Sequence, residues 1–189
     1  MADKHTHNFL RSIIYLLSPF ISFPLILHGI YQKNKLSVFF IIGIVSLVSY
    51  LYIPSISNDK AYYYLLFNDF KRLQFDDFLS NFLAFKTDYI FYFLIYLFAQ
   101  LKLPLHLLFL LITFVTLTNF YLPFLKLVNK LGQPSNKIYL LFVLLLLISF
   151  SPSGLFSGVR YLFAISFVFI AFSNSLIESD KFKKGIVFI

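Results

Sequence analysis

Long apolar blocks recur along this chain, and each is bounded by a proline, a basic loop or a charged stretch. Runs of roughly 18 or more apolar residues are typical of helices that cross a bilayer, where the backbone must satisfy its hydrogen bonds internally. The blocks cover residues 9–31, 36–53, 89–101, 105–125, 138–150 and 155–177. They predict an all-α protein, a polytopic integral membrane helical bundle with about five or six transmembrane helices plus interfacial or re-entrant helices.

The composition fits this class and excludes several others. Hydrophobic residues make up 59% of the chain and charged residues 13%, against about 25% charged in a typical soluble domain. The absence of cysteine excludes disulfides and thiolate metal sites. The net charge of +8 comes from lysines and arginines between the apolar blocks, where such residues set topology and contact lipid headgroups. We therefore expect membrane lipids as partners and no nucleic acid.

The chain shows no domain boundary, so residues 1–189 are expected to form one transmembrane domain. The first block contains Pro19 and Pro24, each of which removes a helix hydrogen bond, so we expect a kinked or broken helix there. The final apolar run, which stops at Ile189, is too short to cross a bilayer. We therefore expect the domain to be incomplete at its C-terminus.

Residues 54–88 form the one extended polar stretch, with five aspartates against four lysines and arginines and a local net charge of −1. The stretch is also aromatic, and some of its side chains recur at helical spacing: Tyr62, Leu65, Leu66, Asp69 and Phe70. Tyrosine is enriched where membrane meets water. We expect an extracytoplasmic amphipathic segment whose short helices lie at the interface.

The topology depends on the block at 89–101, which reaches only about 20 Å at 1.5 Å per residue, against a hydrocarbon core of about 30 Å. If this block spans, the long polar segment lies in the cytoplasm, opposite the turn at 151–154. If it is re-entrant or interfacial, the segment, the turn and Arg160 all lie outside, and the basic loops lie inside as the positive-inside rule requires. The second arrangement leaves Lys4 and Arg11 outside; the resemblance described below favours it.

Arg160 is the one lysine or arginine between Lys137 and Lys181, within an apolar block that follows the turn SPSG. A charge inside an apolar helix is costly and marks a candidate site. One interpretation is an anion clamp, because a guanidinium matches phosphate or carboxylate with two parallel hydrogen bonds. Gly158 would then let a ligand approach the backbone closely. The other interpretation is a side chain that reaches the nearby interface and has no further role.

Other ionisable residues give weaker signals. Asp59 is either the N-cap of a helix or a carboxylate at a substrate vestibule, flanked by tyrosines able to stack on sugar rings. Asp76 and Asp77 would point about 100° apart on a helix, which argues against an acid–base pair. The four histidines have no metal-ligand spacing. We therefore expect neither a metal nor a cofactor.

Three segments follow one another in a fixed order: NDKAYYY, the aromatic run TDYIFYFLIYLF, and the helix start SGVRYLFAISF. This order resembles the EpsG family, the Wzy-like polymerases of bacterial capsule, exopolysaccharide and O-antigen. The resemblance covers roughly residues 36–184. This chain has Tyr161 where the family usually has glutamine. Family members are also nearly twice as long and carry a later histidine-containing helix, so the chain looks like an N-terminal fragment.

The resemblance implies a multi-pass protein of the bacterial inner (cytoplasmic) membrane. Such a protein polymerises lipid-linked oligosaccharide repeat units into capsular or exo-polysaccharide at the outer face of that membrane, as a glycosyltransferase. The substrate would be an undecaprenyl-diphosphate-linked oligosaccharide, and no cofactor would be needed. Other polysaccharide-assembly membrane proteins would be its partners.

The same resemblance implies roles for particular residues. Arg160 matches the family's helix-start arginine and would stabilise the diphosphate leaving group. Asp59 matches the family's external aspartate and would assist deprotonation of the acceptor hydroxyl. The remaining candidates would bind substrate: Tyr62, Tyr63, Gly158 and Tyr161.

Two other functions stay open from the sequence. A transporter or flippase for lipid-linked sugars would also use an outward-facing arginine and kinked helices, although further mid-membrane charges and repeat symmetry are then expected. A truncated, non-catalytic membrane subunit is the third possibility.

The cysteine-free chain allows a direct test of the topology. Single cysteines replacing Asn58 and Ser153 are both expected to react with a membrane-impermeant maleimide added to whole spheroplasts, because both positions lie outside in the re-entrant arrangement. Reaction from opposite faces would contradict this arrangement and would show that the block at 89–101 spans.

Overall fold

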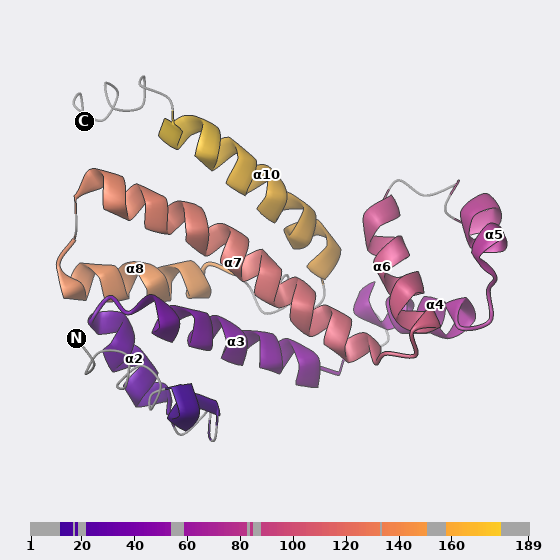
Figure 1. The fold of residues 1–189 in the computed structure, drawn as a ribbon, viewed down its shortest axis with the longest axis horizontal. Coiled ribbons are helices and arrows are strands. Elements are labelled where there is room, and N and C mark those ends of the chain that lie inside the picture. The colour runs from indigo at the N-terminus through magenta and orange to yellow at the C-terminus, as the bar shows by residue number, and fades with distance from the viewer. Residues whose placement is uncertain are drawn as a thin grey trace. The chain divides into compact units, whose positions relative to one another are not determined.

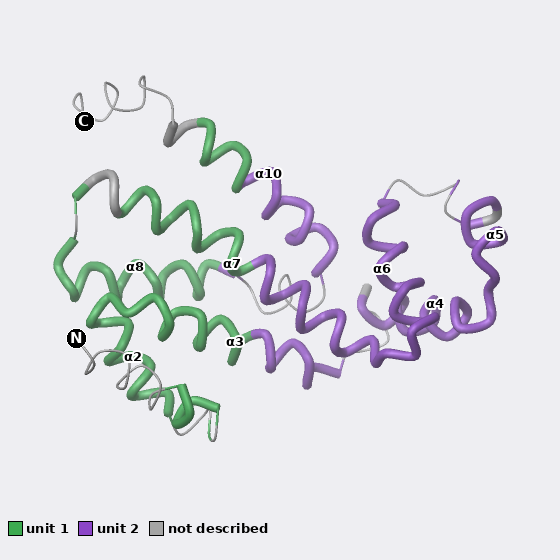
Figure 2. The backbone as a smooth tube through the Cα atoms, in the orientation of Figure 1, with its two compact units in different colours: residues 1–45, 117–149, 170–189 green, residues 46–116, 150–169 purple. Residues whose placement is uncertain are grey.

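The computed structural model describes residues 12–16, 18, 22–53, 59–82, 84, 88–132, 134–150 and 158–178. Every regular element in these ranges is helical and none is a strand (Figure 1), which confirms the all-α prediction. The chain divides into two compact units (Figure 2). Unit 1 comprises residues 1–45, 117–149 and 170–189, and unit 2 comprises residues 46–116 and 150–169.

Each apolar block contains a helix, and every helix but the first lies close to its predicted bounds. The helices are α2 (Phe23–Tyr31), α3 (Lys35–Leu51), α6 (Tyr89–Gln100), α7 (Leu105–Leu131), α8 (Asn136–Ile148) and α10 (Val159–Glu178). Within the described ranges, one stretch is long and apolar enough to cross a membrane, Leu105–Val128 in α7. Helix α7 also continues six residues beyond its predicted end, through part of the basic loop, and tolerates Pro123 in its interior.

The first block is broken, as its prolines predict. Helix α2 begins only at Phe23, and Pro24 occupies its first turn, where a missing N–H leaves no helix hydrogen bond unmade. Pro19 lies outside the described residues. In unit 1, α2 packs against α8, and Gly29 fits tightly against α3, since a Cβ there would lie 2.9 Å from the Cβ of Ser37.

The polar segment forms the short helices expected of it: α4 (Asp59–Phe70), α5 (Phe75–Asp77) and the π-helix η1 (Phe78–Phe82). The buried face of α4 is displaced from the predicted stripe. Tyr62 and Leu65 are 46% and 66% exposed, whereas the buried positions are Tyr63, Leu66, Phe67 and Phe70. The displacement arises because α4 packs on α6 (Figure 1), and the ring of Tyr63 meets that of Phe91 edge-on at 4.9 Å.

The core of unit 2 is largely aromatic. The ring of Phe78 stacks on Tyr96 with centroids 4.2 Å apart, and Phe82 lies edge-on to Tyr92 at 5.3 Å. The Gln100 amide donates to the carbonyl oxygen of Phe70 at 2.8 Å. Offset and edge-on rings add specific attraction to the burial of apolar area. This core holds α4, η1 and α6 together.

Polar contacts join the long helices inside each unit. In unit 2, the Thr113 hydroxyl of α7 donates to that of Ser49 in α3 at 2.9 Å. In unit 1, Lys126 of α7 donates to the Asn174 amide oxygen of α10 at 2.7 Å. The Thr113–Ser49 contact compensates two buried hydroxyl groups, whereas the Lys126–Asn174 contact lies at the surface.

Lys60 is fully buried, which is rare for a lysine. Its ammonium donates to the carbonyl oxygens of Ser49 (2.8 Å) and Tyr52 (3.3 Å) and lies 4.5 Å from the ring centre of Phe109. The Ser49 carbonyl belongs to the last turn of α3, where carbonyls lack helix partners and the helix dipole is negative. Lys60 therefore caps α3 and ties α4 to its end.

Burial lowers the pKa of Lys60 to about 8, from 10.5 for an exposed lysine. Between these two values the unfolded chain binds more protons at this position than the folded chain, so the free energy of unfolding rises with pH. Below pH 8 both states hold the proton and the dependence disappears.

We expect the free energy of unfolding in detergent to contain a Lys60 contribution that grows by about 2 kcal/mol from pH 8 to pH 10. Lys60→Met should remove this slope, measured by denaturant titration at each pH. The exposed Lys71 at the end of α4 offers a matched control, and Lys71→Met should leave the slope intact. Equal slopes in the wild type and Lys60→Met would contradict the assignment.

Candidate functional site

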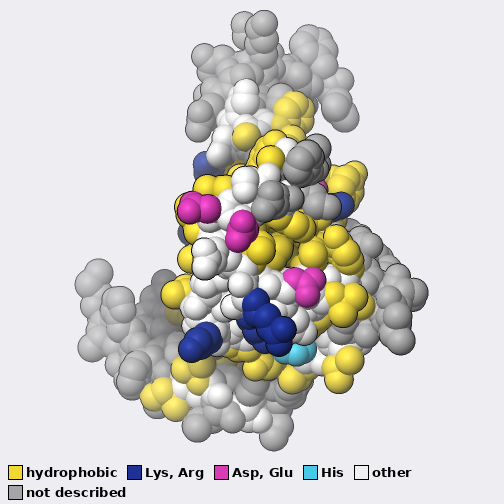
Figure 3. Space-filling view, turned by 90° about the vertical axis from the view of Figure 1, so that its right-hand side faces the viewer, with side chains coloured by type: hydrophobic (Ala, Val, Ile, Leu, Met, Phe, Trp, Pro, Cys, Tyr) yellow, Lys and Arg dark blue, Asp and Glu magenta, His cyan; other side chains and the backbone are white. Residues whose placement is uncertain are grey.

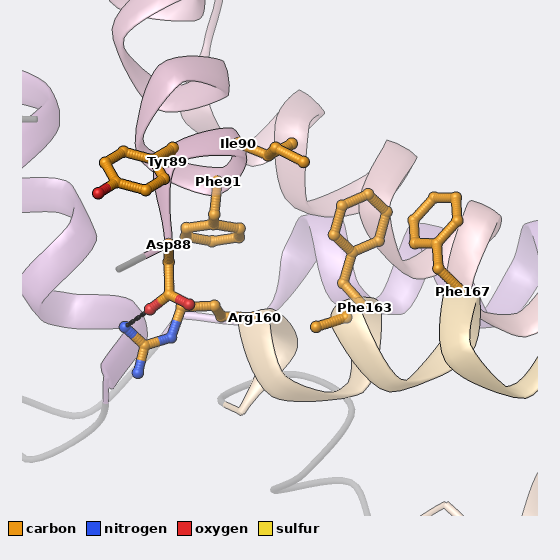
Figure 4. Close-up of a pocket in the computed structure, with 8 residues that line it drawn as sticks. Asp88, Tyr89, Ile90, Phe91, Arg160, Phe163 and Phe167 are labelled. Carbon is orange, nitrogen blue, oxygen red and sulfur yellow. Dashed lines mark ion pairs between the residues drawn. The ribbon is translucent and has the colours of Figure 1, made fainter. Parts of the chain in front are cut away.

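Arg160 lies in the first turn of α10 and forms an ion pair with Asp88. Its Nη1 is 2.8 Å from the Asp88 Oδ2, and the two side chains are 40% and 41% exposed (Figure 4). The same nitrogen donates a long hydrogen bond of 3.5 Å to the Tyr92 hydroxyl. Arg160 therefore already holds one carboxylate in this structure.

Asp88 occupies the N-cap position of α6 but does not cap it. Its backbone angles are φ −103° and ψ 57°, and its side chain makes no hydrogen bond to the first turn of the helix. Helix α8 shows the usual alternative: Ser135, at φ −59° and ψ 157°, accepts a hydrogen bond from the Ile138 N–H. The Asp88 carboxylate is thus directed to Arg160 instead of its own helix.

The ion pair lies at the edge of a cavity of about 440 Å³. Apart from this pair, the wall is apolar or aromatic and comes from α6 and α10: Tyr89, Ile90, Phe91, Phe163, Ala164 and Phe167. Phe163 and Phe167 project from successive turns of α10 toward the side on which Ile90 and Phe91 lie (Figure 4). An apolar chamber with one charged edge suits an amphiphilic ligand.

The other predicted site residues that the structure describes in full do not line this cavity. Tyr161, the neighbour of Arg160, is 69% exposed and does not line the cavity. Gly158 lies directly before α10 and is partly buried. Tyr62 is exposed on α4, whereas Tyr63 is 3% exposed and its ring packs in the core. Asp59 is the first residue of α4, and its side chain lies outside the described part of the chain.

A second polar cluster in unit 2 joins α4 to α7. The Nδ1 of His106 lies 3.0 Å from the Tyr50 carbonyl oxygen, and the Tyr64 hydroxyl lies 2.7 Å from the same nitrogen and 3.1 Å from Nε2. Burial and the nearby Tyr50 raise the pKa of Tyr64 to about 12, which keeps the hydroxyl protonated as a donor. His106 and Tyr64 line an open cavity of about 380 Å³ with Ile53 and Ala61.

The described residues contain no group of three histidine, aspartate or glutamate side chains placed to hold a metal ion. On the face shown in Figure 3, hydrophobic side chains are abundant, and a group of lysine or arginine side chains lies beside a histidine with acidic side chains nearby. The Arg160–Asp88 pair joins two opposite charges to the wall of a cavity.

Sequence reasoning did not single out Asp88. It appeared only as one of the aspartates of the polar segment and as part of TDYIFYFLIYLF. The available signal was an acidic residue directly before an apolar helix, which ordinarily indicates an N-cap. Its pairing with Arg160 is a tertiary contact that no local pattern contains.

Comparison with protein-family models, with curated proteins and with solved structures gave no match to this chain.

Proposed function

We propose that this chain is a polytopic membrane protein of the Wzy-like type, which joins lipid-linked oligosaccharide repeat units into capsular or exo-polysaccharide at the outer face of the inner membrane. The observation that carries the proposal is Arg160 at the charged edge of an otherwise apolar cavity. A lipid diphosphate likewise has a charged part and an apolar part, because its multiply charged head is joined to a long apolar chain. The guanidinium suits the head, and the aromatic wall suits the chain.

The surfaces of individual helices support a membrane location. On α8, Ile148 is 74% exposed, and on α10, Val168 and Phe172 are 68% and 61% exposed. Large apolar side chains gathered at a surface are costly in water and favourable in lipid. The buried hydroxyl contact between Ser49 and Thr113 is also of the kind found between packed transmembrane helices.

The proposed chemistry is glycosyl transfer. The acceptor hydroxyl attacks the anomeric carbon of the donor sugar, the bond from that carbon to the diphosphate oxygen breaks, and the diphosphate leaves with the electron pair. Negative charge grows on the leaving oxygen, and Arg160 would stabilise it more strongly in the transition state than in the ground state. A base takes the proton of the attacking hydroxyl, and Asp59 remains the proposed group for this step.

We expect Arg160→Ala to lower polymer formation about 100-fold, as loss of one preorganised donor typically does. Arg160→Lys should restore it only in part, since an ammonium lacks the planar fork. The assay is complementation of a polymerase-deleted host, with polysaccharide length and amount read on gels and protein level in membranes read by blot. Arg72→Ala is the matched control, because Arg72 is exposed and lies outside the cavity wall.

The outcomes of this assay separate the candidate functions. Single repeat units that reach the cell surface without being polymerised would support a polymerase. Loss of surface repeat units in Arg160→Ala would indicate a transporter instead. Unchanged polymer length and amount would contradict any role for Arg160 as an anion clamp.

Filling the cavity tests the apolar part of the proposal. Ala164 lines the cavity, so Ala164→Phe should place a ring where the lipid chain would lie and shorten the polymer while Arg160 remains. Ala171→Phe makes the same change on the same helix at an exposed position outside the wall. Equal polymer from the two variants would show that this cavity is not used.

A further inference from the structure

We propose that Asp88 is an internal competitor for the anion site on Arg160, which weakens the hold on bound anions and takes the arginine back when the leaving group departs. The inference rests on the proposed function for the identity of the anion, a lipid diphosphate. The competition itself rests on the geometry of Asp88, Arg160 and α6.

The first step is that the ion pair is displaceable. Both side chains are about two-fifths exposed, and ion pairs in such positions contribute little net stability because water solvates the separated charges well. A carboxylate offers the guanidinium a single negative charge. A diphosphate offers at least two, on oxygens that match the two-pronged donor geometry, so it can displace Asp88.

The second step is that Asp88 has another partner within reach. It stands at the N-cap of α6, a helix of 12 residues whose first turn receives no hydrogen bond from that side chain. Aspartate is among the preferred N-cap residues, and its charge is favourable at this end of the helix dipole. A displaced carboxylate can therefore cap its own helix.

Judged by Ser135, a capping state of Asp88 would differ from the present one mostly at ψ and less at φ, which is −103° at Asp88 and −59° at Ser135. Asp88 now has ψ 57°, whereas the capping residue Ser135 has ψ 157°. Rotation about this bond would carry the carboxylate from Arg160 to the first turn of α6. Each state satisfies the carboxylate, so the exchange costs less than the loss of an ion pair alone.

The third step is that Arg160 stays oriented when Asp88 leaves. Its Nη1 also donates to the Tyr92 hydroxyl, and Tyr92 is buried in the core of unit 2. Among the eight residues that line the cavity, Asp88 carries the one carboxylate and Arg160 the one cation. An arriving anion therefore meets a single competitor at the wall.

Such competition has a function in the proposed reaction. Arg160 attracts the leaving group in the product as well as in the transition state, and a tightly held product would slow turnover. An anion can bind only to those molecules in which Arg160 is not paired with Asp88. The apparent affinity for every anion is therefore lowered by the same factor, which is set by the fraction of such molecules. Asp88 would thus favour release of the product.

The test is binding to the purified full chain in detergent, measured by calorimetry with farnesyl diphosphate, inorganic pyrophosphate and farnesol. Asp88→Asn keeps an N-cap side chain but removes the charge, so both anions should bind about two- to fivefold more tightly, by a common factor. Farnesol, which has no anion, should bind as it does to the wild type. Asp88→Glu keeps the charge but is a poorer cap, so its anion binding should be no tighter than that of the wild type.

A purely structural ion pair would give the opposite pattern. In that case Asp88→Asn would loosen α6 from α10 and weaken farnesyl diphosphate and farnesol alike. Unchanged or weaker anion binding in Asp88→Asn, or no anion binding by the wild type and this variant, overturns the inference. Tighter pyrophosphate binding in Asp88→Asn, together with no polymer from the wild-type chain in the polymerase-deleted host, would uphold the competitor and reject the polymerase.

Discussion

A helical chain must provide partners for the backbone groups at each helix end, since the first N–H groups and the last carbonyls have none within the helix. At several helix ends in the described part of this chain, polar side chains or tight turns provide them. Lys60 caps the end of α3, and Ser135 caps the start of α8. Lys33 and Lys102 take the left-handed conformation that closes α2 and α6.

The turn after α6 ends that helix through backbone hydrogen bonds. Lys102 has φ 55°, and its N–H and that of Leu103 donate to the carbonyls of Ala99 and Phe98. This hydrogen-bond pattern is the Schellman motif, here with lysine where glycine is usual. Helix α6 has 12 residues, and Asp88 at its other end forms an ion pair with Arg160 in the first turn of α10. At the start of α6, the Asp88 carboxylate pairs with Arg160 and does not cap the helix. The same ion pair forms the charged part of the cavity wall.

Helix α6 also connects the cavity to the core of unit 2. Phe91 lines the cavity and lies edge-on to Tyr63 of α4, while Tyr92 contacts both Arg160 and the ring of Phe82. Phe91 and Tyr92, consecutive residues of one turn, therefore contact the candidate site and also pack in the core. A ligand that displaced α6 would also displace α4 through these ring contacts, because closely packed interiors transmit displacement.

The sequence was sufficient to predict the helices, the break near Pro24 and the short helix at 89–101, because hydrophobic run length and proline act locally. The side chains that recur at helical spacing in α4 begin at Tyr62, whereas the buried face begins one residue later, at Tyr63. Packing against α6 determines which aromatic face of α4 is buried. Nothing local distinguishes Lys60 from the other charges of the polar segment, and its burial depends on the carbonyls at the end of α3. Arg160 was found from its isolation, but its partner Asp88 is remote in sequence and required the fold.

The aromatic wall of the cavity has a spectroscopic consequence. The chain has 13 tyrosines and no tryptophan, so its native emission comes from tyrosine alone. A tryptophan introduced at Phe167 would be the single red-shifted emitter in the protein and would stand in the wall beside Phe163. Its colour and its quenching by brominated lipid would then report whether water, detergent or an acyl chain fills the chamber.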